Sequence, residues 1–163
     1  MEILGLLGLG AAAVALHAAA RGRFELGPGH QGLTWVALLT IGRLTSGLRW
    51  AGVTSAIGAA STALLPVWGL GDPFRWLTYL MAGLTVDVAY RALPRVREAV
   101  WLLALIGGLA HTTKPLVRTM ITHGTGWPFD SLIAGLSYPL LTHFLFGAAG
   151  AGIGAAVMRS LRR

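Results

Sequence analysis

Long apolar segments alternate with short segments rich in glycine, proline and charged residues along the whole 163-residue chain. A helix needs roughly 20 apolar residues to cross the hydrocarbon core of a bilayer, which is about 30 Å thick. Six segments approach that length, and the connections between them are too short for a soluble domain. We therefore expect one domain of six transmembrane helices, at residues 3–20, 33–48, 51–67, 75–93, 99–121 and 131–158.

The composition agrees with this pattern. Hydrophobic residues make up 55% of the chain and charged residues only 12%, fewer than a soluble domain of this size needs on its surface. The chain has no cysteine, which excludes disulfides and thiolate metal sites. The net charge of +7 comes from arginines at the ends of apolar segments, so we interpret it as a determinant of topology and expect no nucleic-acid partner. These observations predict an all-α integral membrane protein.

The distribution of cations predicts the orientation of the helices. Lysine and arginine accumulate in the cytoplasmic connections of membrane proteins. A cytoplasmic N-terminus leaves five cations on the outer side, namely Arg21, Arg23, Arg75, Lys114 and Arg118. It places eight arginines on the cytoplasmic side: Arg43, Arg49, Arg91, Arg95, Arg97, Arg159, Arg162 and Arg163. We therefore expect both termini in the cytoplasm.

Three aspartates near helix ends have simple structural interpretations. Asp72 and Asp130 precede the fourth and sixth predicted helices, where a carboxylate can accept the first free N–H groups of a helix. Asp87 lies within the fourth segment, where an unpaired carboxylate is unfavourable. We expect it to pair with Arg91, Arg43 or Arg49.

The fifth predicted helix carries the strongest candidate for a binding site. His111, Lys114 and Arg118 share one helical face because they follow each other at intervals of three and four residues. Two cations inside an apolar segment are unfavourable unless they are paired or face a polar cavity. One interpretation is a structural ion pair, or snorkelling to the outer interface; the acidic residues expected on that side are Glu25, Asp72 and Asp130. We favour the other interpretation, a cavity that opens outward and takes a ligand with a negative group.

Two outer loops are rich in aromatic residues and glycine. They carry Trp68, Phe74 and Trp76 before and at the start of the fourth helix, and Trp127 and Phe129 before the sixth. Such residues occur in the aromatic belts at membrane interfaces. They would equally suit a lid over an amphipathic ligand.

The first helix carries small residues at intervals of four, Ala11, Ala15 and Ala19. Small residues at this spacing allow two helix backbones to approach closely in lipid. The face serves either packing within this protein or docking of another membrane subunit.

The whole pattern resembles the substrate-binding S component of energy-coupling factor (ECF) vitamin transporters. The resemblance rests on the number of helices, the placement of the outer loops, the alanine spacing of the first helix and the run Leu65-Pro-Val-Trp-Gly-Leu-Gly-Asp-Pro-Phe…Tyr79-Leu-Met-Ala-Gly-Leu-Thr-Val-Asp87. It implies a subunit in a bacterial or archaeal cytoplasmic membrane that captures a vitamin or related micronutrient. Ala11, Ala15 and Ala19 would then dock a transmembrane coupling subunit. Two separate ATPase subunits would supply the energy, since the chain has no Gly-x-x-x-x-Gly-Lys-Ser/Thr loop.

The expected substrate-binding residues come from helix 5, the outer loops and the start of helix 4: Trp68, Asp72, Phe74, Trp76, Tyr79, His111, Lys114, Arg118, His123, Trp127 and Phe129. No nucleophile with a neighbouring base and no metal-ligand spacing stands out, so we predict neither an enzyme nor a metal site. The alternative is an accessory or anchor subunit of a larger membrane complex, with haem held by His111 and His143.

Overall fold

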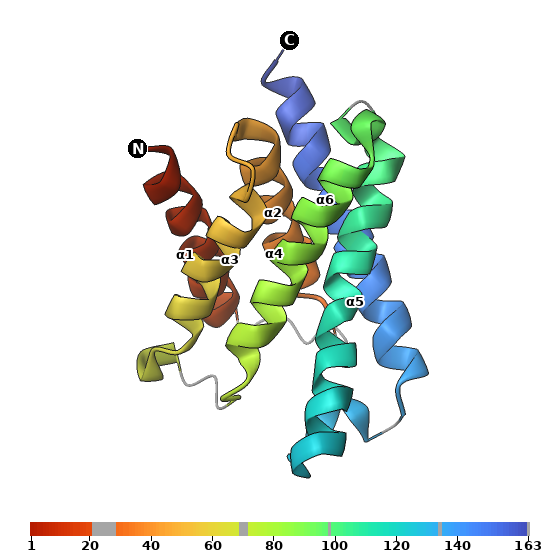
Figure 1. The fold of residues 1–163 in the computed structure, drawn as a ribbon. Coiled ribbons are helices and arrows are strands. Elements are labelled where there is room, and N and C mark those ends of the chain that lie inside the picture. The colour runs from red at the N-terminus through yellow and green to blue at the C-terminus, as the bar shows by residue number, and fades with distance from the viewer. Residues whose placement is uncertain (21–28, 69–71, 98, 134, 163) are drawn as a thin grey trace.

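A computed structural model describes residues 1–20, 29–68, 72–97, 99–133 and 135–162. The described part is all-helical (Figure 1). Its six α-helices are α1 (Glu2–Ala20), α2 (Gly32–Thr45), α3 (Ala51–Ala63), α4 (Arg75–Ala92), α5 (Val100–Thr125) and α6 (Ser137–Ser160). Three short 3-10 helices follow α3, α4 and α5, at Pro66–Trp68 (η1), Pro94–Arg97 (η2) and Asp130–Leu132 (η3).

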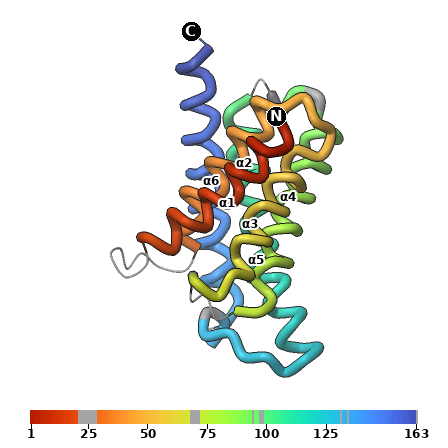
Figure 2. The backbone as a smooth tube through the Cα atoms, turned by 90° about the vertical axis from the view of Figure 1, so that its left-hand side faces the viewer, coloured from red at the N-terminus to blue at the C-terminus, as the bar shows by residue number. Residues whose placement is uncertain are grey.

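The helices form a closed ring in which the spatial order differs from the chain order. α3 packs between α1 and α4, α5 between α4 and α6, and α2 closes the ring by contacting both α6 and α1. Both chain ends lie toward the same end of the bundle, the upper end in Figures 1 and 2. The connections α2–α3 and α4–α5 lie at that end too, whereas α3–α4 and α5–α6 turn at the opposite end (Figure 1). We call these the terminal end and the distal end.

Three helices among the described residues are long and apolar enough to cross a membrane: α1 with 19 residues, α5 with 26 and α6 with 24. They expose large apolar side chains such as Leu16, Leu109 and Leu145, each at least half exposed. An outward apolar surface of this kind belongs in lipid. The chain is therefore a membrane protein.

The other three helices depart from the predicted full-length spans. α2 and α3 have 14 and 13 residues, which gives each a length of only about 20 Å at 1.5 Å per residue. α4 has 18 residues but includes the charged residues Arg75, Asp87 and Arg91. These three helices contribute much of the buried core, including Val36, Leu39, Ala59 and Val86.

Proline and glycine account for the helix ends that differ from prediction. α3 stops at Ala63, short of residue 67, because Pro66 lacks an N–H and disfavours a helical residue before it. α5 continues past residue 121 to Thr125 and ends at Gly126, which has a φ of +73°. α6 begins at Ser137, not 131, after Gly135 with a φ of +90°.

Glycines allow the helices to pack backbone against backbone. A Cβ added to Gly10 of α1 would collide with the backbone carbonyl oxygen of Ser55 in α3, and one added to Gly58 of α3 would collide with the carbonyl oxygen of Leu7. Gly107 of α5 and Gly147 of α6 face each other in the same way. Close approach of this kind is how helices associate in lipid, where burial of apolar surface drives little packing.

This packing predicts the effect of a single methyl group. Gly10→Ala should lower the free energy of unfolding by about 1–3 kcal/mol, because the methyl group forces the α1 and α3 backbones apart. Gly8→Ala is the matched control: Gly8 lies two residues away on the opposite, exposed side of α1, with no neighbouring atom within 4 Å, so the change should be neutral or slightly stabilising. Thermal unfolding in detergent measures both. Equal effects of the two substitutions would contradict the proposed close crossing.

Candidate functional site

A small cavity lies inside the bundle between α2, α4 and α5. Its volume is about 10 Å³, close to that of one water molecule. Half of the side chains in its wall are aromatic or small and apolar, and the other half are polar or ionisable. The lining residues are Gln31, Trp35, Thr78, Tyr79, Ala82, Ala110, His111 and Lys114.

Lys114 is the most unusual of these residues. It is 6% exposed, and no residue in the described part of the chain forms a hydrogen bond or ion pair with it. A buried ammonium group without a partner is unfavourable by several kcal/mol. Pro115 follows it and has no N–H, so the carbonyl oxygen of His111 receives no helical hydrogen bond from that position. Lys114 is therefore a buried amine beside a cavity, with no hydrogen-bond or ion-pair partner among the described residues.

Two histidines pack against each other next to the cavity. The ring of His111 lies 4.8 Å from that of His143, centroid to centroid. The His111 Nε2 atom is 3.0 Å from the carbonyl oxygen of Gly29, and the His143 Nδ1 atom is 2.7 Å from that of Pro139. A haem iron between the two rings would hold them apart by the thickness of the macrocycle. Rings in direct contact do not favour the haem alternative.

Arg118, one turn further along α5, has an ion-pair partner. Its Nη2 atom lies 2.5 Å from the Oδ2 atom of Asp72, and its guanidinium also stacks on the ring of Phe129 at 4.9 Å. Asp72 lies before α4 in the chain and accepts the backbone N–H of Phe74 at 3.0 Å. Arg75 lies 4.0 Å from the same carboxylate. Of the structural ion pairs considered from the sequence, the described residues thus contain one for Arg118 and none for Lys114.

Aromatic contacts join the two distal loops. Phe74, before α4, meets Trp127, after α5, edge to face at a centroid distance of 5.8 Å. Together with the Asp72–Arg118 pair, this contact connects the segment before α4 to α5 and the loop after it, at the distal end of the bundle. Phe129 is 9% exposed, while Trp127 is 40% exposed.

The structure brings together most of the predicted site residues, in two groups. Tyr79, His111 and Lys114 line the cavity, and Asp72, Phe74, Arg118, Trp127 and Phe129 form the distal contacts. Trp76 and His123 are exposed and belong to neither group. The side chain of Trp68 lies outside the described residues, as does Glu25.

Sequence reasoning missed several lining residues. Trp35 meets Tyr79 edge to face at 5.0 Å, and Gln31 immediately precedes α2 without capping it through its side chain. Gln31 is the only amide side chain in the sequence, and its position at the start of an apolar helix was a usable signal. Thr78 and Ala82 lie on the same face of α4 as the predicted Tyr79, which the helical period would have revealed.

Two predictions about aspartates need correction. Neither Asp72 nor Asp130 caps an α-helix: α4 and α6 begin at Arg75 and Ser137, and neither N-cap residue makes a side-chain capping bond. Asp72 instead holds the turn before α4, and Asp130 begins η3. The glycine at 135 separates Asp130 from the helix that it was expected to cap.

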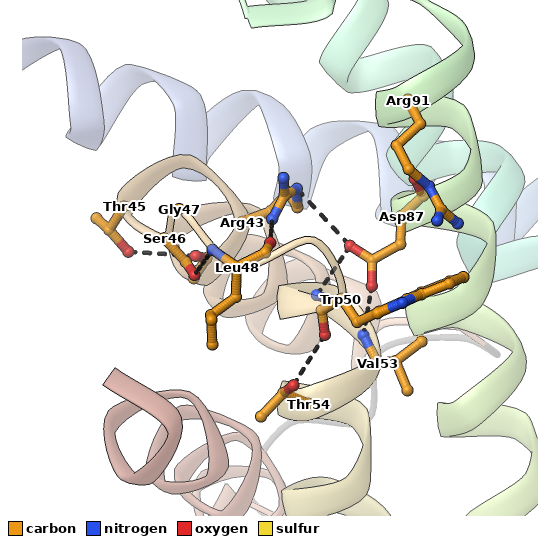
Figure 3. Close-up of polar contacts among 12 residues, drawn as sticks. Arg43, Thr45, Ser46, Gly47, Leu48, Trp50, Val53, Thr54, Asp87 and Arg91 are labelled. Atoms are coloured by element: carbon orange, nitrogen blue, oxygen red, sulfur yellow. Dashed lines mark hydrogen bonds and ion pairs between the residues drawn. The ribbon is translucent and has the colours of Figure 1, made fainter. Parts of the chain in front are cut away.

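The predicted pairing of Asp87 is confirmed, with Arg43 as the partner (Figure 3). The Nε atom of Arg43 lies 3.7 Å from the Oδ1 atom of Asp87. The same carboxylate accepts the backbone N–H groups of Gly52 and Val53 at 3.0 and 2.8 Å, so Asp87 of α4 caps α3. This network lies near the terminal end and is structural.

Two wider surface grooves are less suited to an anionic ligand. One, of about 360 Å³, lies between α4 and α5 and is lined by apolar residues such as Leu77, Met81 and Met120. The other, of about 410 Å³, includes the carboxylate of Glu2. Neither is lined by a lysine, arginine or histidine of the described chain.

Comparison with family models, curated proteins and solved structures finds no match to this chain.

The contrast between the two cations of α5 gives a stability test. Lys114→Met should raise the free energy of unfolding by at least about 1 kcal/mol, because it removes a buried charge that has no partner. Arg118→Met should lower it by about 2–4 kcal/mol, because Asp72 loses its closest cation. Thermal unfolding of both variants in the same detergent measures the difference. Destabilisation by Lys114→Met would mean that the lysine is a structural residue.

Proposed function

We propose that this chain is the substrate-binding membrane subunit of an ECF-type importer and that it captures a vitamin or related micronutrient through an anionic group. The observation that supports the proposal is the buried side-chain amine of Lys114, which faces a cavity and has no acceptor among the described residues. Ionisable groups inside membrane bundles mark ligand or ion pathways more often than they serve packing.

The surroundings of Lys114 favour an anion over a cation or a neutral ligand. Arg118 and Arg75 lie on the distal side of Lys114, and Asp72 is the one carboxylate paired with them in the described chain. Lys114 therefore lies in a part of the bundle where basic side chains gather. A carboxylate or phosphate group would accept hydrogen bonds from Lys114 there. Trp35 and Tyr79 would then contact the apolar or aromatic remainder of the ligand.

The proposal requires the distal end to open. A small-molecule site normally encloses about 300–1,000 Å³, far more than the cavity beside Lys114. α4 and α5 would separate at the distal end, where the Asp72–Arg118 pair and the Phe74–Trp127 contact hold them. These few contacts at the end of the bundle would act as the lid expected from the outer loops.

The proposed orientation places the terminal end in the cytoplasm and the distal end outside, with six spans. The short α2 and α3 would cross with the help of their connecting segments and of the longer helices around them. Reporter fusions after Arg163 and within residues 126–130 test this topology. We expect a cytoplasmic reporter to be active at the first site and inactive at the second; an external C-terminus would contradict it.

Docking of a coupling subunit is proposed for α1. The buried face of α1 consists of Leu6, Gly10, Ala13 and Val14, while Ala19 is exposed and Ala11 and Ala15 are half-buried. Because Ala19 points away from the bundle, Ala19→Leu should abolish assembly with the coupling subunit without disturbing the fold. Ala156→Leu, at an exposed position of α6, is the matched control. Co-purification measures assembly, and an intact complex with Ala19→Leu would contradict this docking face.

The main experiment identifies the ligand. Mass spectrometry of small molecules that co-purify with the native chain should detect an anionic compound that is absent from Lys114→Met preparations. The loss of one charge-assisted contact should lower affinity tens- to thousands-fold, corresponding to about 2–5 kcal/mol. Trp101→Phe, at an exposed residue near the start of α5 and away from the cavity, is the control and should retain the compound. A compound retained equally by Lys114→Met would refute the proposed role of Lys114.

A further inference from the structure

A tryptophan and two arginines form a second group of interest, at the terminal end of the bundle. Trp50 lies in the α2–α3 turn and is 42% exposed. The guanidinium of Arg91, from the last turn of α4, lies 3.7 Å from the centroid of the Trp50 ring, and that of Arg49 lies 5.7 Å from it. Figure 3 shows the side chain of Arg91 directed over the indole of Trp50.

Both arginines retain unused hydrogen-bond donors. Arg91 donates from Nε to the carbonyl oxygen of Asp87 at 3.0 Å, and no acceptor in the described chain engages its two terminal nitrogens. Arg49 is exposed and has no carboxylate within ion-pair distance in the same part of the chain. The carboxylate of Asp87 is already occupied by Gly52, Val53 and Arg43. These donors are therefore available to an external anion.

An exposed apolar strip continues from this group along α3 and α4. Leu84, Val88 and Arg91 share one face of α4 because they are four and three residues apart. Trp50 and Ile57 lie two turns apart near the start of the adjacent α3. Ile57, Leu84 and Val88 are 46%, 38% and 48% exposed. The strip thus combines positive groups at one end with an apolar surface running toward the middle of the bundle.

We propose that Arg49, Trp50 and Arg91 bind the phosphate of an anionic glycerophospholipid, whose acyl chain lies along Val88, Leu84 and Ile57. A guanidinium stacked on an aromatic ring keeps its N–H groups in one plane, and this arrangement suits two parallel hydrogen bonds to phosphate. Tryptophan favours the headgroup level of a bilayer, which places the phosphate and the indole at the same depth. The apolar strip distinguishes a lipid from a free anion, and this site does not depend on the proposed substrate.

Native mass spectrometry of the detergent-purified protein tests the site with phosphatidylglycerol, with phosphatidylcholine of the same acyl chains, and with inorganic phosphate. We expect phosphatidylglycerol to bind, phosphatidylcholine to bind at least severalfold more weakly, and inorganic phosphate not to bind detectably. Arg49→Gln and Arg91→Gln should each weaken phosphatidylglycerol binding about fivefold, the contribution of one basic residue near an anionic lipid surface. Arg95→Gln removes an exposed arginine at the same end and should leave binding unchanged.

Further variants separate this site from general charge attraction. Arg49→Lys keeps the charge but loses the planar stacking, so it should weaken binding as Arg49→Gln does, though less. Val88→Asn should weaken lipid binding without altering the charge. Because Arg49 makes no hydrogen bond to the described chain, its variants should fold normally, which thermal unfolding checks. Equal losses for Arg95→Gln and Arg49→Gln, equal binding of the two lipids, or binding of inorganic phosphate alone would overturn the proposal.

Discussion

A charged side chain inside a helix bundle in lipid has to be matched by the protein itself, because hydrocarbon provides no solvation. The described chain meets this requirement at two of its three buried sites of charge. Asp87 is surrounded by Arg43 and by two N–H groups at the start of α3, and Arg118 is paired with Asp72. Lys114 is the exception. Its position is understandable if the missing negative charge belongs to a ligand.

The small residues of the chain bring several pairs of helices close together. Glycines at the contacts of α1 with α3 and of α5 with α6 bring the helix backbones close together. Elsewhere in the bundle, α4 and α5 pack side by side, and Arg118 reaches Asp72 across 46 residues of sequence. The same close packing leaves a cavity of only about 10 Å³ beside Lys114. Binding of a larger ligand would therefore require movement at the distal end, where the Asp72–Arg118 pair and the Phe74–Trp127 contact join the described parts of the two connections.

The sequence predicted the helical class and the approximate position of each helix, since apolar segments of this length have few other solutions in a chain with so little charge. It also limited the partner of Asp87 to three arginines, of which Arg43 is the one observed. It could not tell that Asp72 would pair with Arg118, because that contact depends on how α4 and α5 lie side by side. Helix ends were misjudged where hydropathy continues past a local break, as at Pro66 and Gly135. Trp35 was overlooked because a tryptophan in an apolar helix looks like ordinary core until the residue facing it, here Tyr79, is known.

The central claim is that Lys114, and not Arg118, receives the negative group of the ligand. An experimental structure of the protein with its co-purified small molecule tests this claim most directly. We predict an oxygen atom of the ligand within about 3 Å of the Lys114 Nζ atom, the usual length of a hydrogen bond between an ammonium and an oxyanion. The cavity lined by Trp35 and Tyr79 should be widened around the rest of the molecule. A ligand bound elsewhere, with Lys114 still without an anionic partner, would contradict the account.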